Sequence, residues 1–208
     1  TWQRYGPNGI NQDITLAHVD ASGFSTPATM TVCNYSGIQK TPFLTGVEDG
    51  VIVTWEDHRY LEDNIFAQKV TLGMTPQWNT NGREICSTSA SKYLKSIFPD
   101  GDGGALINWH DLTTSNGTRY SQRINADGDI VWHSDGIAYT TAGYDQGRGS
   151  VVSDGHGGLL AVWSRVARQA RRKSSAPLQA ASARFRLRGL LEHACDLLLA
   201  VGLQTSAK

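Results

Sequence analysis

A stretch that ends in tryptophan recurs along this chain at a fixed interval, and no other feature constrains the fold as much. Residues 100–109 read Asp-Gly-x-Gly-Gly, then an apolar run, then tryptophan, and residues 154–163 repeat this pattern. A weaker copy occupies residues 46–55. The tryptophans that close the three stretches are 54 positions apart (109 − 55 and 163 − 109). A fixed long period predicts an array of one structural unit, because each unit buries its apolar face against its neighbour.

The residue pattern within each unit predicts four short strands. A first apolar run, such as Phe43-Leu44, is followed by a turn of glycine and aspartate, where glycine supplies the positive φ that hairpins need. The continuous apolar run into the tryptophan is typical of a buried strand. Residues 64–70 and 118–124 then alternate as strands do, and residues 83–86 and 137–140 supply the last strand. Four strands in a period of about 50 residues are typical of a propeller blade, so we expect an all-β chain.

Further residues repeat at the same interval, and we expect them to have structural roles. The second tryptophan of each unit recurs after 54 positions (132 − 78), and so does the last glycine of the turn (158 − 104). We expect the tryptophan that closes each stretch to be mostly buried. The predicted structural residues of the repeat are Trp55, Trp109, Trp163, Trp78, Trp132, Gly104 and Gly158.

The repeat occupies residues 1–164. It predicts a half blade at 1–40, full blades at 41–94 and 95–148, and a half blade at 149–164. Closed propellers typically contain four to eight four-stranded antiparallel blades. The expected architecture is therefore an incomplete β-propeller, with the missing blades in a longer parent chain.

Residues 165–208 do not continue the pattern. Residues 1–163 carry 10 Lys and Arg against 17 Asp and Glu, a net charge of −7, whereas residues 164–208 carry 9 against 2, a net charge of +7. Apolar residues at steps of three and four between Leu187 and Val201 predict a short amphipathic helix after a basic linker. Two interpretations stay open: a genuine helical tail, or an out-of-frame product.

Cys33 and Cys86 occupy matching repeat positions, 53 apart (86 − 33). The repeat holds matching positions of neighbouring units apart, so we expect both cysteines to be free, small core residues. The odd total of three cysteines also argues against a disulfide framework.

The sequence offers no recognisable catalytic, metal or cofactor motif. It contains no Gly-x-Ser-x-Gly, no phosphate loop and no dinucleotide fingerprint, and its histidines lack zinc-site spacing. Asp57 and Asp111 recur two positions after the tryptophan, which favours a repeated structural job such as accepting turn amides. The turn at 100–103 alternates oxygens as calcium loops do, but it lacks the later bidentate glutamate, so we interpret it as a tight hairpin. We therefore expect no catalytic residue, no metal and no cofactor.

The residues that differ between units are the better candidates for binding. In a propeller the loops after the tryptophan strand and the connections between blades should open on one face. Aromatic and polar side chains there suit a protein or a glycan as the ligand. The candidate ligand-binding residues are His58, Arg59, Tyr60, Tyr93, Tyr144 and Asp145.

The units resemble secreted bacterial β-propeller repeat proteins with blades of roughly 54 residues. The resemblance covers residues 1–164 and rests on Asp100–Asp111, Tyr120–Arg123, Asp127-Gly128, Trp132 and Asp135–Ile137. It implies export to the extracellular space or the cell surface, a parent with more blades than this chain, and no cofactor.

The expected function is that of a non-catalytic surface or adhesion module that binds a protein or a glycan at the loop face of the propeller. We expect no nucleic-acid partner, since a solvated segment explains the basic tail, and no membrane span, since no apolar run is long enough. The alternative is a fragment of an exported carbohydrate-active, glycoside hydrolase-like propeller enzyme. Such an enzyme needs two facing carboxylates, and the repeat singles out no pair. Five positions separate Gly104 from Trp109, where a sialidase box has three, which argues against that type of propeller.

Overall fold

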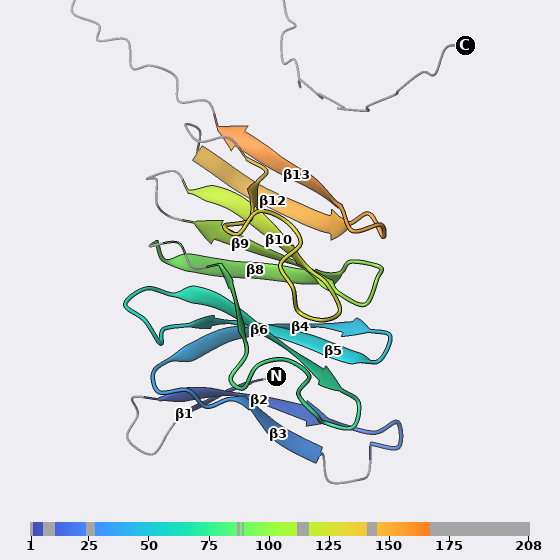
Figure 1. Ribbon diagram of the computed structural model, residues 1–208. Helices are drawn as coiled ribbons and strands as arrows, with labels where there is room; N and C mark the ends of the chain where they lie inside the picture. The colour runs from blue at the N-terminus through green and yellow to red at the C-terminus, as the bar shows by residue number, and fades with distance from the viewer. Residues whose placement is uncertain are drawn as a thin grey trace, which may run out of the picture. The chain divides into compact units, whose positions relative to one another are not determined.

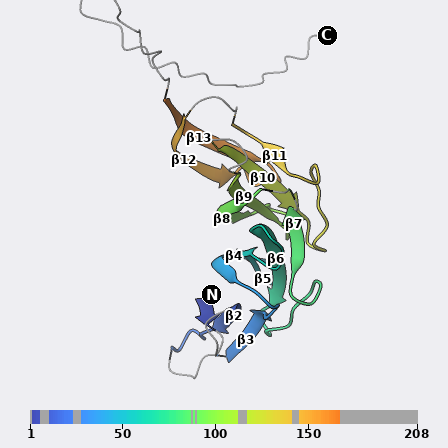
Figure 2. The same ribbon diagram turned by 90° about the vertical axis from the view of Figure 1, so that its left-hand side faces the viewer.

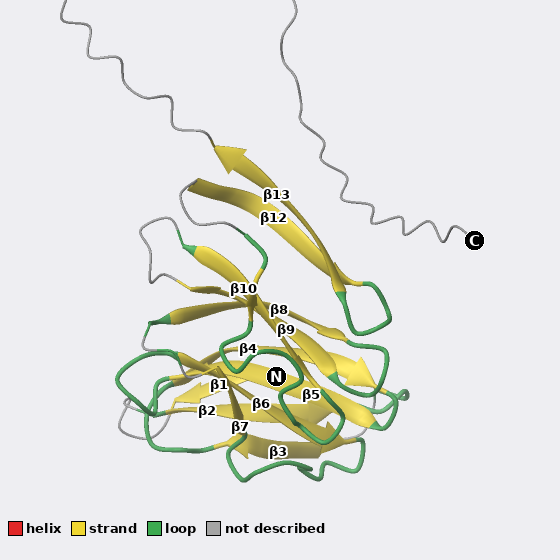
Figure 3. Ribbon diagram, turned by 45° about the horizontal axis from the view of Figure 1, so that its top comes forward, coloured by secondary structure: helices red, strands yellow, loops and turns green. Residues whose placement is uncertain are grey.

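The described part of the chain is all-β (Figure 1). The computed structural model describes residues 2–5, 11–23, 28–86, 88, 90–111, 117–140 and 145–166. Figure 3, which colours strands and loops, shows no helix in these ranges, and so none that is long and apolar enough to cross a membrane. The chain divides into two units, residues 1–169 and 170–208, and all described residues belong to the first. Of the predicted tail at 165–208, only residues 165 and 166 are described, so the predicted helix lies outside the described residues.

The described strands form four antiparallel sheets in chain order, and within each sheet every strand pairs with its neighbours in sequence. The first sheet contains β1 (Trp2–Tyr5), β2 (Gln12–His18) and β3 (Ala28–Cys33). The second contains β4 (Gln39–Val47), β5 (Gly50–Asp57), β6 (Asn64–Thr71) and β7 (Arg83–Cys86). The third contains β8 (Lys92–Pro99), β9 (Ala105–Asp111), β10 (Thr118–Ile124) and β11 (Ile137–Ala138). The last contains β12 (Asp145–Ser153) and β13 (Leu159–Val166).

The two complete sheets share one register. Trp55 of β5 lies opposite Phe66 of β6, and Trp109 of β9 lies opposite Tyr120 of β10. The rings of each pair stack, with centroids 6.3 Å and 5.9 Å apart. The prediction of four antiparallel strands per unit is therefore confirmed for both sheets.

The predicted unit boundaries differ from the strand boundaries. The positions 40/41, 94/95 and 148/149 fall inside β4, β8 and β12, and β13 continues past the predicted end at 164 to Val166. The reason is that the second and third sheets begin with buried polar residues, Gln39 and Lys92, and an apolar run therefore does not mark where the first strand starts.

Apolar contacts between consecutive sheets form the core. Figure 2 shows these sheets following one another in chain order. One cluster joins the first and second sheets: Ile14, Leu16, Val32, Cys33, Val53, Trp55, Phe66 and Val70. The other joins the second and third sheets: Ile52, Ile65, Ala67, Ile85, Cys86, Leu94, Ile97, Ala105, Ile107, Trp109 and Ile124. The side chains of β5 alternate between the clusters, so the second sheet is packed on both faces.

A glycine lies against each buried tryptophan ring. A Cβ on Gly82 would come 2.4 Å from Trp55, and a Cβ on Gly136 would come 2.6 Å from Trp109. Both glycines also have positive φ, 86° and 79°. The repeat therefore requires glycine here for two reasons, the backbone conformation and the contact with the ring.

The predicted burial is correct for two of the three tryptophans and wrong for the third. Trp55 and Trp109 are 0% and 1% exposed, whereas Trp163 is 37% exposed. The difference follows from strand number, because β13 pairs only with β12 among the described strands. Among the described residues Trp163 therefore lacks a stacked cross-strand partner like Phe66 or Tyr120, and its ring instead meets that of Tyr139 edge-on, with centroids 6.5 Å apart.

Cys33 and Cys86 are buried and free, as expected. Burial raises the pKa of the Cys33 thiol to about 11 and also raises that of Cys86. Both thiols therefore stay protonated at neutral pH, and neither is an activated nucleophile.

Candidate interaction face

The candidate interaction face lies where the β3–β4 connection (residues 34–38), the β5–β6 loop (residues 58–63) and the start of β8 meet. The amide of His58 donates to the carbonyl of Ile38 over 2.8 Å. The amide of Lys92 donates to the carbonyl of Asp63 over 3.1 Å. The loop is therefore held on one side by the connection before its own sheet and on the other by the first strand of the next sheet.

Arg59 forms a buried ion pair with Asp57 at the base of this face. Its Nη2 donates to Oδ2 of Asp57 over 2.6 Å, and its backbone amide donates to Oδ1 over 3.0 Å. The guanidinium also donates to the carbonyl of Asn81 over 2.8 Å. Its carbon lies 4.4 Å from the ring centre of Tyr35 and 3.8 Å from that of Phe66.

These contacts correct one prediction. The side chain of Arg59 is only 7% exposed, and its donors bind groups of the protein itself. Arg59 is therefore a structural residue that fastens the loop to the second sheet. The sequence placed it among the ligand contacts because loop arginines are usually solvated, and nothing local reveals that Tyr35 and Phe66 lie on either side of it.

Asp57 is also a structural residue, as its recurrence predicts. It accepts a turn amide from Arg59 and, in addition, the indole N–H of Trp55 over 2.8 Å. The equivalent Asp111 accepts the hydroxyl of Thr88 over 3.5 Å. In the described part of the chain the indole nitrogen of Trp109 has no hydrogen-bond partner. The Trp-x-Asp pattern thus recurs, but its hydrogen bond does not.

A second polar network surrounds Asp63. Its carboxylate lies 2.8 Å from Nζ of Lys40 and 3.2 Å from Nδ1 of His58. The neighbouring Glu56 is buried and accepts the amide of Leu94, on the third sheet, over 2.7 Å. Burial raises the pKa of Glu56 against the opposing effect of that amide. The carboxylate of Glu56 therefore links the second sheet to the third, whereas that of Asp63 holds the β5–β6 loop against β4.

Lys92 is a buried structural lysine that the sequence did not single out. It is 0% exposed, and its ammonium donates to Oδ1 of Asn64 and to the carbonyls of Thr88 and Ala90, over 2.9, 2.6 and 2.9 Å. It therefore ties the connection between the second and third sheets to β6. In the strand register Lys92 lies opposite Asp111, as Gln39 lies opposite Asp57. Lys92 and Gln39 are therefore equivalent positions, although their residue types differ.

Aromatic and apolar side chains project from the same face into solvent. Tyr35, Tyr60 and Tyr93 are all exposed, Tyr60 to 55%, and Leu61 is exposed to 91%. The ammonium of Lys95 lies 5.7 Å from the centre of the Tyr93 ring. Of the predicted ligand contacts, His58, Tyr60 and Tyr93 thus lie together on the surface. Tyr144 is outside the described residues, and Asp145 is described only by its backbone pairing with Val166.

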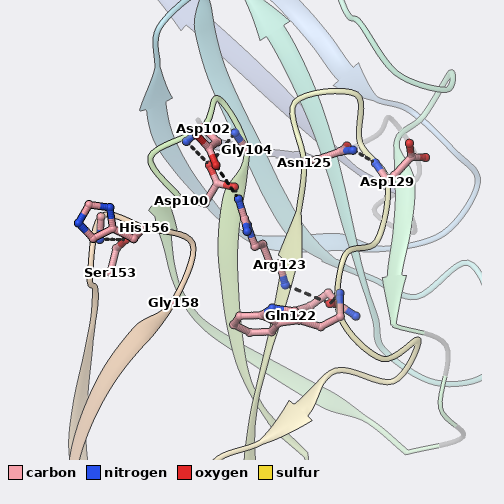
Figure 4. Close-up of polar contacts among 12 residues, drawn as sticks. Asp100, Asp102, Gly104, Gln122, Arg123, Asn125, Asp129, Ser153, His156 and Gly158 are labelled. Atoms are coloured by element: carbon pink, nitrogen blue, oxygen red, sulfur yellow. Dashed lines mark hydrogen bonds and ion pairs between the residues drawn. The ribbon is translucent and has the colours of Figure 1, made fainter. Parts of the chain in front are cut away.

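The Asp-Gly turns lie at the opposite ends of the strands and use their carboxylates internally. Oδ1 of Asp100 accepts the amides of Asp102 and Gly104, each over 2.8 Å, and its Oδ2 accepts Nε of Arg123 over 2.8 Å (Figure 4). Asp154 accepts the amides of His156 and Gly158 over 2.8 and 2.9 Å. Gly104 and Gly158 therefore close equivalent turns, which supports the interpretation as tight hairpins.

The turn end also contains an open pocket of about 710 Å³. Glu48, Asp49 and Asp102 contribute carboxylates to it, and Lys69, which is paired with Asp49 over 3.0 Å, contributes an ammonium. Among the described residues no group of three or more His, Cys, Asp or Glu side chains is placed to hold a metal ion.

Gln68 of β6 and Gln122 of β10 hold the segment that leads to the fourth strand of their sheet, a role that the sequence pattern did not reveal. Gln68 donates to the carbonyl of Asn79 over 2.8 Å and accepts the amide of Trp78 over 2.8 Å. Gln122 and Trp132 repeat the second contact over 3.2 Å. The indole of Trp78 reaches the third sheet, where it donates to the carbonyl of Ala126 over 3.2 Å. Trp78 therefore links the second sheet to the third.

Comparison of this chain with family models, with curated proteins and with solved structures found no match.

Proposed function

We propose that this chain is part of an incomplete β-propeller of the secreted bacterial repeat type and that it acts as a non-catalytic surface or adhesion module. The recurrence of one four-stranded antiparallel sheet after 54 residues supports the proposal (109 − 55). So does the packing of consecutive sheets through their apolar faces. A propeller likewise consists of four-stranded sheets that pack face to face in the order of the chain. Export to the cell surface or the extracellular space is part of the proposal.

The observation that carries the binding role is the set of exposed tyrosines on the candidate interaction face. Tyr35, Tyr60 and Tyr93 are exposed above a network that is braced by ion pairs. A tyrosine offers a flat apolar surface and a hydroxyl at little cost in side-chain entropy, which suits a glycan or a peptide. Ion pairs hold the loop that carries Tyr60, so a ligand pays a smaller entropic cost for ordering this surface when it binds. The proposed partner is a protein or a glycan.

The alternative, a fragment of a carbohydrate-active enzyme, has less support. A glycosidase needs one carboxyl that donates a proton and one that attacks or activates water. On this face Glu56, Asp57 and Asp63 are buried and bound to Leu94, Arg59 and Lys40, respectively. An enzyme of this type would have to take its carboxylates from other parts of a longer parent.

A panel of glycans and peptides, screened against the full chain, tests the proposal. We expect a ligand whose affinity falls in the double variant Tyr60→Ala/Tyr93→Ala. Leu72→Ala and Val131→Ala are matched controls, because both side chains are exposed but lie outside this face, and they should leave affinity unchanged. Binding that ignores the tyrosines would contradict the proposal. Hydrolysis of a panel glycan by the purified chain would favour the enzyme.

A further inference from the structure

The last sheet has an open strand edge. In the second and third sheets the tryptophan strand is paired on both sides, by β4 and β6 around β5 and by β8 and β10 around β9. β13 is paired on one side only, by β12, among the strands that the structure describes. An unpaired strand edge presents backbone donors and acceptors that can pair with another chain.

The two complete sheets show which side chains a third strand carries. An aromatic residue, Phe66 or Tyr120, lies opposite the tryptophan and stacks on it. Three positions later comes a basic residue, Lys69 or Arg123 (69 − 66 and 123 − 120). Both sheets therefore share the third-strand pattern aromatic-x-x-basic.

The basic residue pairs with an aspartate of the first hairpin turn of its own sheet. Nζ of Lys69 lies 3.0 Å from Asp49, and Nε of Arg123 lies 2.8 Å from Asp100 (Figure 4). The ion pair joins the third strand to the turn between the first two strands. The two aspartates occupy different positions of that turn, since Asp49 corresponds to position 103 (49 + 54), but in both sheets the basic residue is paired at the turn end of the third strand.

The last sheet retains the tryptophan of both complete sheets and the turn aspartate that the third sheet uses. Trp163 is at the position of Trp109 and is partly exposed. Asp154 is at the position of Asp100 (154 − 100 = 54), and among the described residues no lysine or arginine lies within ion-pair distance of it. A hollow of about 510 Å³ lies beside Trp163 and is also lined by Gly149, Ser150, Val162 and Ser164.

We propose that the open edge of β13 binds an extended segment of another polypeptide as a third, antiparallel strand. The segment carries an aromatic residue opposite Trp163 and a lysine or arginine three positions later, beside Asp154. Backbone hydrogen bonds to the edge supply affinity, and these two side chains supply specificity, as in other cases of strand addition. The site is separate from the candidate interaction face and does not depend on what that face binds.

A labelled peptide with the sequence of residues 117–125 tests the proposal on the full chain. This peptide contains Tyr120 and Arg123 in their native spacing. We expect saturable binding by fluorescence anisotropy and protection of β13 amides in hydrogen exchange. A Tyr120→Ser peptide should bind roughly three- to tenfold more weakly, because it loses the ring stack. Trp163→Ala in the protein should weaken the native peptide by a similar factor and leave the Tyr120→Ser peptide little changed.

A charge exchange tests the predicted register. Asp154→Lys should weaken the native peptide about two- to fivefold, the range for a solvent-accessible ion pair. An Arg123→Glu peptide should recover that loss on the Asp154→Lys protein and bind poorly to the unchanged protein. His156→Ala is the control, since its side chain is exposed on the same turn and has no place in the proposed pairing.

Three results would overturn the proposal. The first is no binding up to about millimolar peptide. The second is binding that protects β8–β11 or the candidate interaction face but not β13. The third is binding to which Trp163, Asp154 and the peptide residues contribute nothing.

Discussion

Arg59 and Asp57 form an ion pair, 2.6 Å from Nη2 to Oδ2, between two aromatic rings. The pair connects the β5–β6 loop to the end of the tryptophan strand. Asp57 binds the indole of Trp55 on one side and the guanidinium on the other, so one buried carboxylate organises both the core and the loop.

Asp57→Asn should therefore destabilise the protein strongly. It leaves the guanidinium of Arg59 buried without its counter-charge, which typically costs about 3–5 kcal/mol. The free energy of unfolding in urea measures the effect. We expect Arg59→Lys to be destabilising too, because an ammonium cannot reproduce the planar contact with Tyr35 and Phe66.

A double-mutant cycle separates the pair from its surroundings. In Asp57→Asn/Arg59→Met no charge remains buried alone, so the double variant should lose less stability than the two single variants together. Strictly additive losses would mean that the ion pair is not the interaction that matters.

The three equivalent tryptophans should differ in how much stability they contribute. Trp109→Ala removes a fully buried ring that stacks on Tyr120 and should cost about 3–5 kcal/mol. Trp163→Ala removes a ring that is 37% exposed and should cost only about 1–2 kcal/mol. Equal shifts in the urea midpoint would contradict the assigned difference between complete and two-stranded sheets.

The contrast between the two buried indoles can be tested by removing the N–H alone. Trp55→Phe takes a donor from the buried carboxylate of Asp57, which should cost about 1–3 kcal/mol beyond the change in ring size. Trp109→Phe removes an N–H that has no partner among the described residues, so the change in ring size should dominate there. If Trp109→Phe lowered the free energy of unfolding more than Trp55→Phe, the hydrogen bond from Trp55 to Asp57 would not be what distinguishes the two indoles.

The strands could be predicted well from the sequence because the same residue pattern occurs in several units. Each unit gave an independent example of the apolar run, the turn and the tryptophan, so the strands of the two complete sheets could be placed before the structure was known. The cross-strand register came from the structure, which places Phe66 and Tyr120 at matching positions opposite Trp55 and Trp109.

The roles of individual polar residues could not be predicted, because they depend on contacts between sheets. Arg59 and His58 are adjacent in a loop, yet one is buried between two rings and the other is exposed. Lys92 starts a strand and is buried by groups from the preceding sheet. Residues far away in the sequence decide whether a charged side chain is solvated. A repeat pattern shows only what the units have in common, so it does not reveal such differences between them.

The glycine beneath Trp55 should not tolerate a side chain. Gly82→Ala would place a methyl group 2.4 Å from the ring and would also strain a backbone with φ of 86°. Gly23→Ala is the matched control, since Gly23 has φ of 66° and no atom within 4 Å of the new Cβ. The control should lose about 1–2 kcal/mol from the backbone alone, and Gly82→Ala about 1–3 kcal/mol more. Equal losses would mean that the ring moves aside freely.

The acid sensitivity of the protein should depend on the turn of the third sheet. Burial tends to raise the pKa of Asp100, but the amides of Asp102 and Gly104 and the guanidinium of Arg123 outweigh it, so its pKa lies below the ordinary value of 3.8. A carboxyl with a lowered native pKa binds fewer protons in the native than in the unfolded state. Its stabilisation is therefore present above 3.8 and is lost as the pH falls through the native pKa.

Asp100→Asn should remove this acid-dependent contribution. Above the ordinary aspartate pKa the variant should be less stable than the unchanged protein by about 1.5–3 kcal/mol, the range for a hydrogen bond to a charged group. As the pH falls through the lower native pKa, the two curves of unfolding free energy against pH should converge, because the unchanged carboxyl then becomes protonated in the native state as well. Asp154→Asn is the control: this carboxyl accepts the same turn amides but has no arginine partner among the described residues, so its substitution should have a smaller effect. Urea unfolding at a series of pH values decides the matter, and a constant gap between Asp100→Asn and the unchanged protein down to the lowest pH would show that the charge of Asp100 does not stabilise the turn.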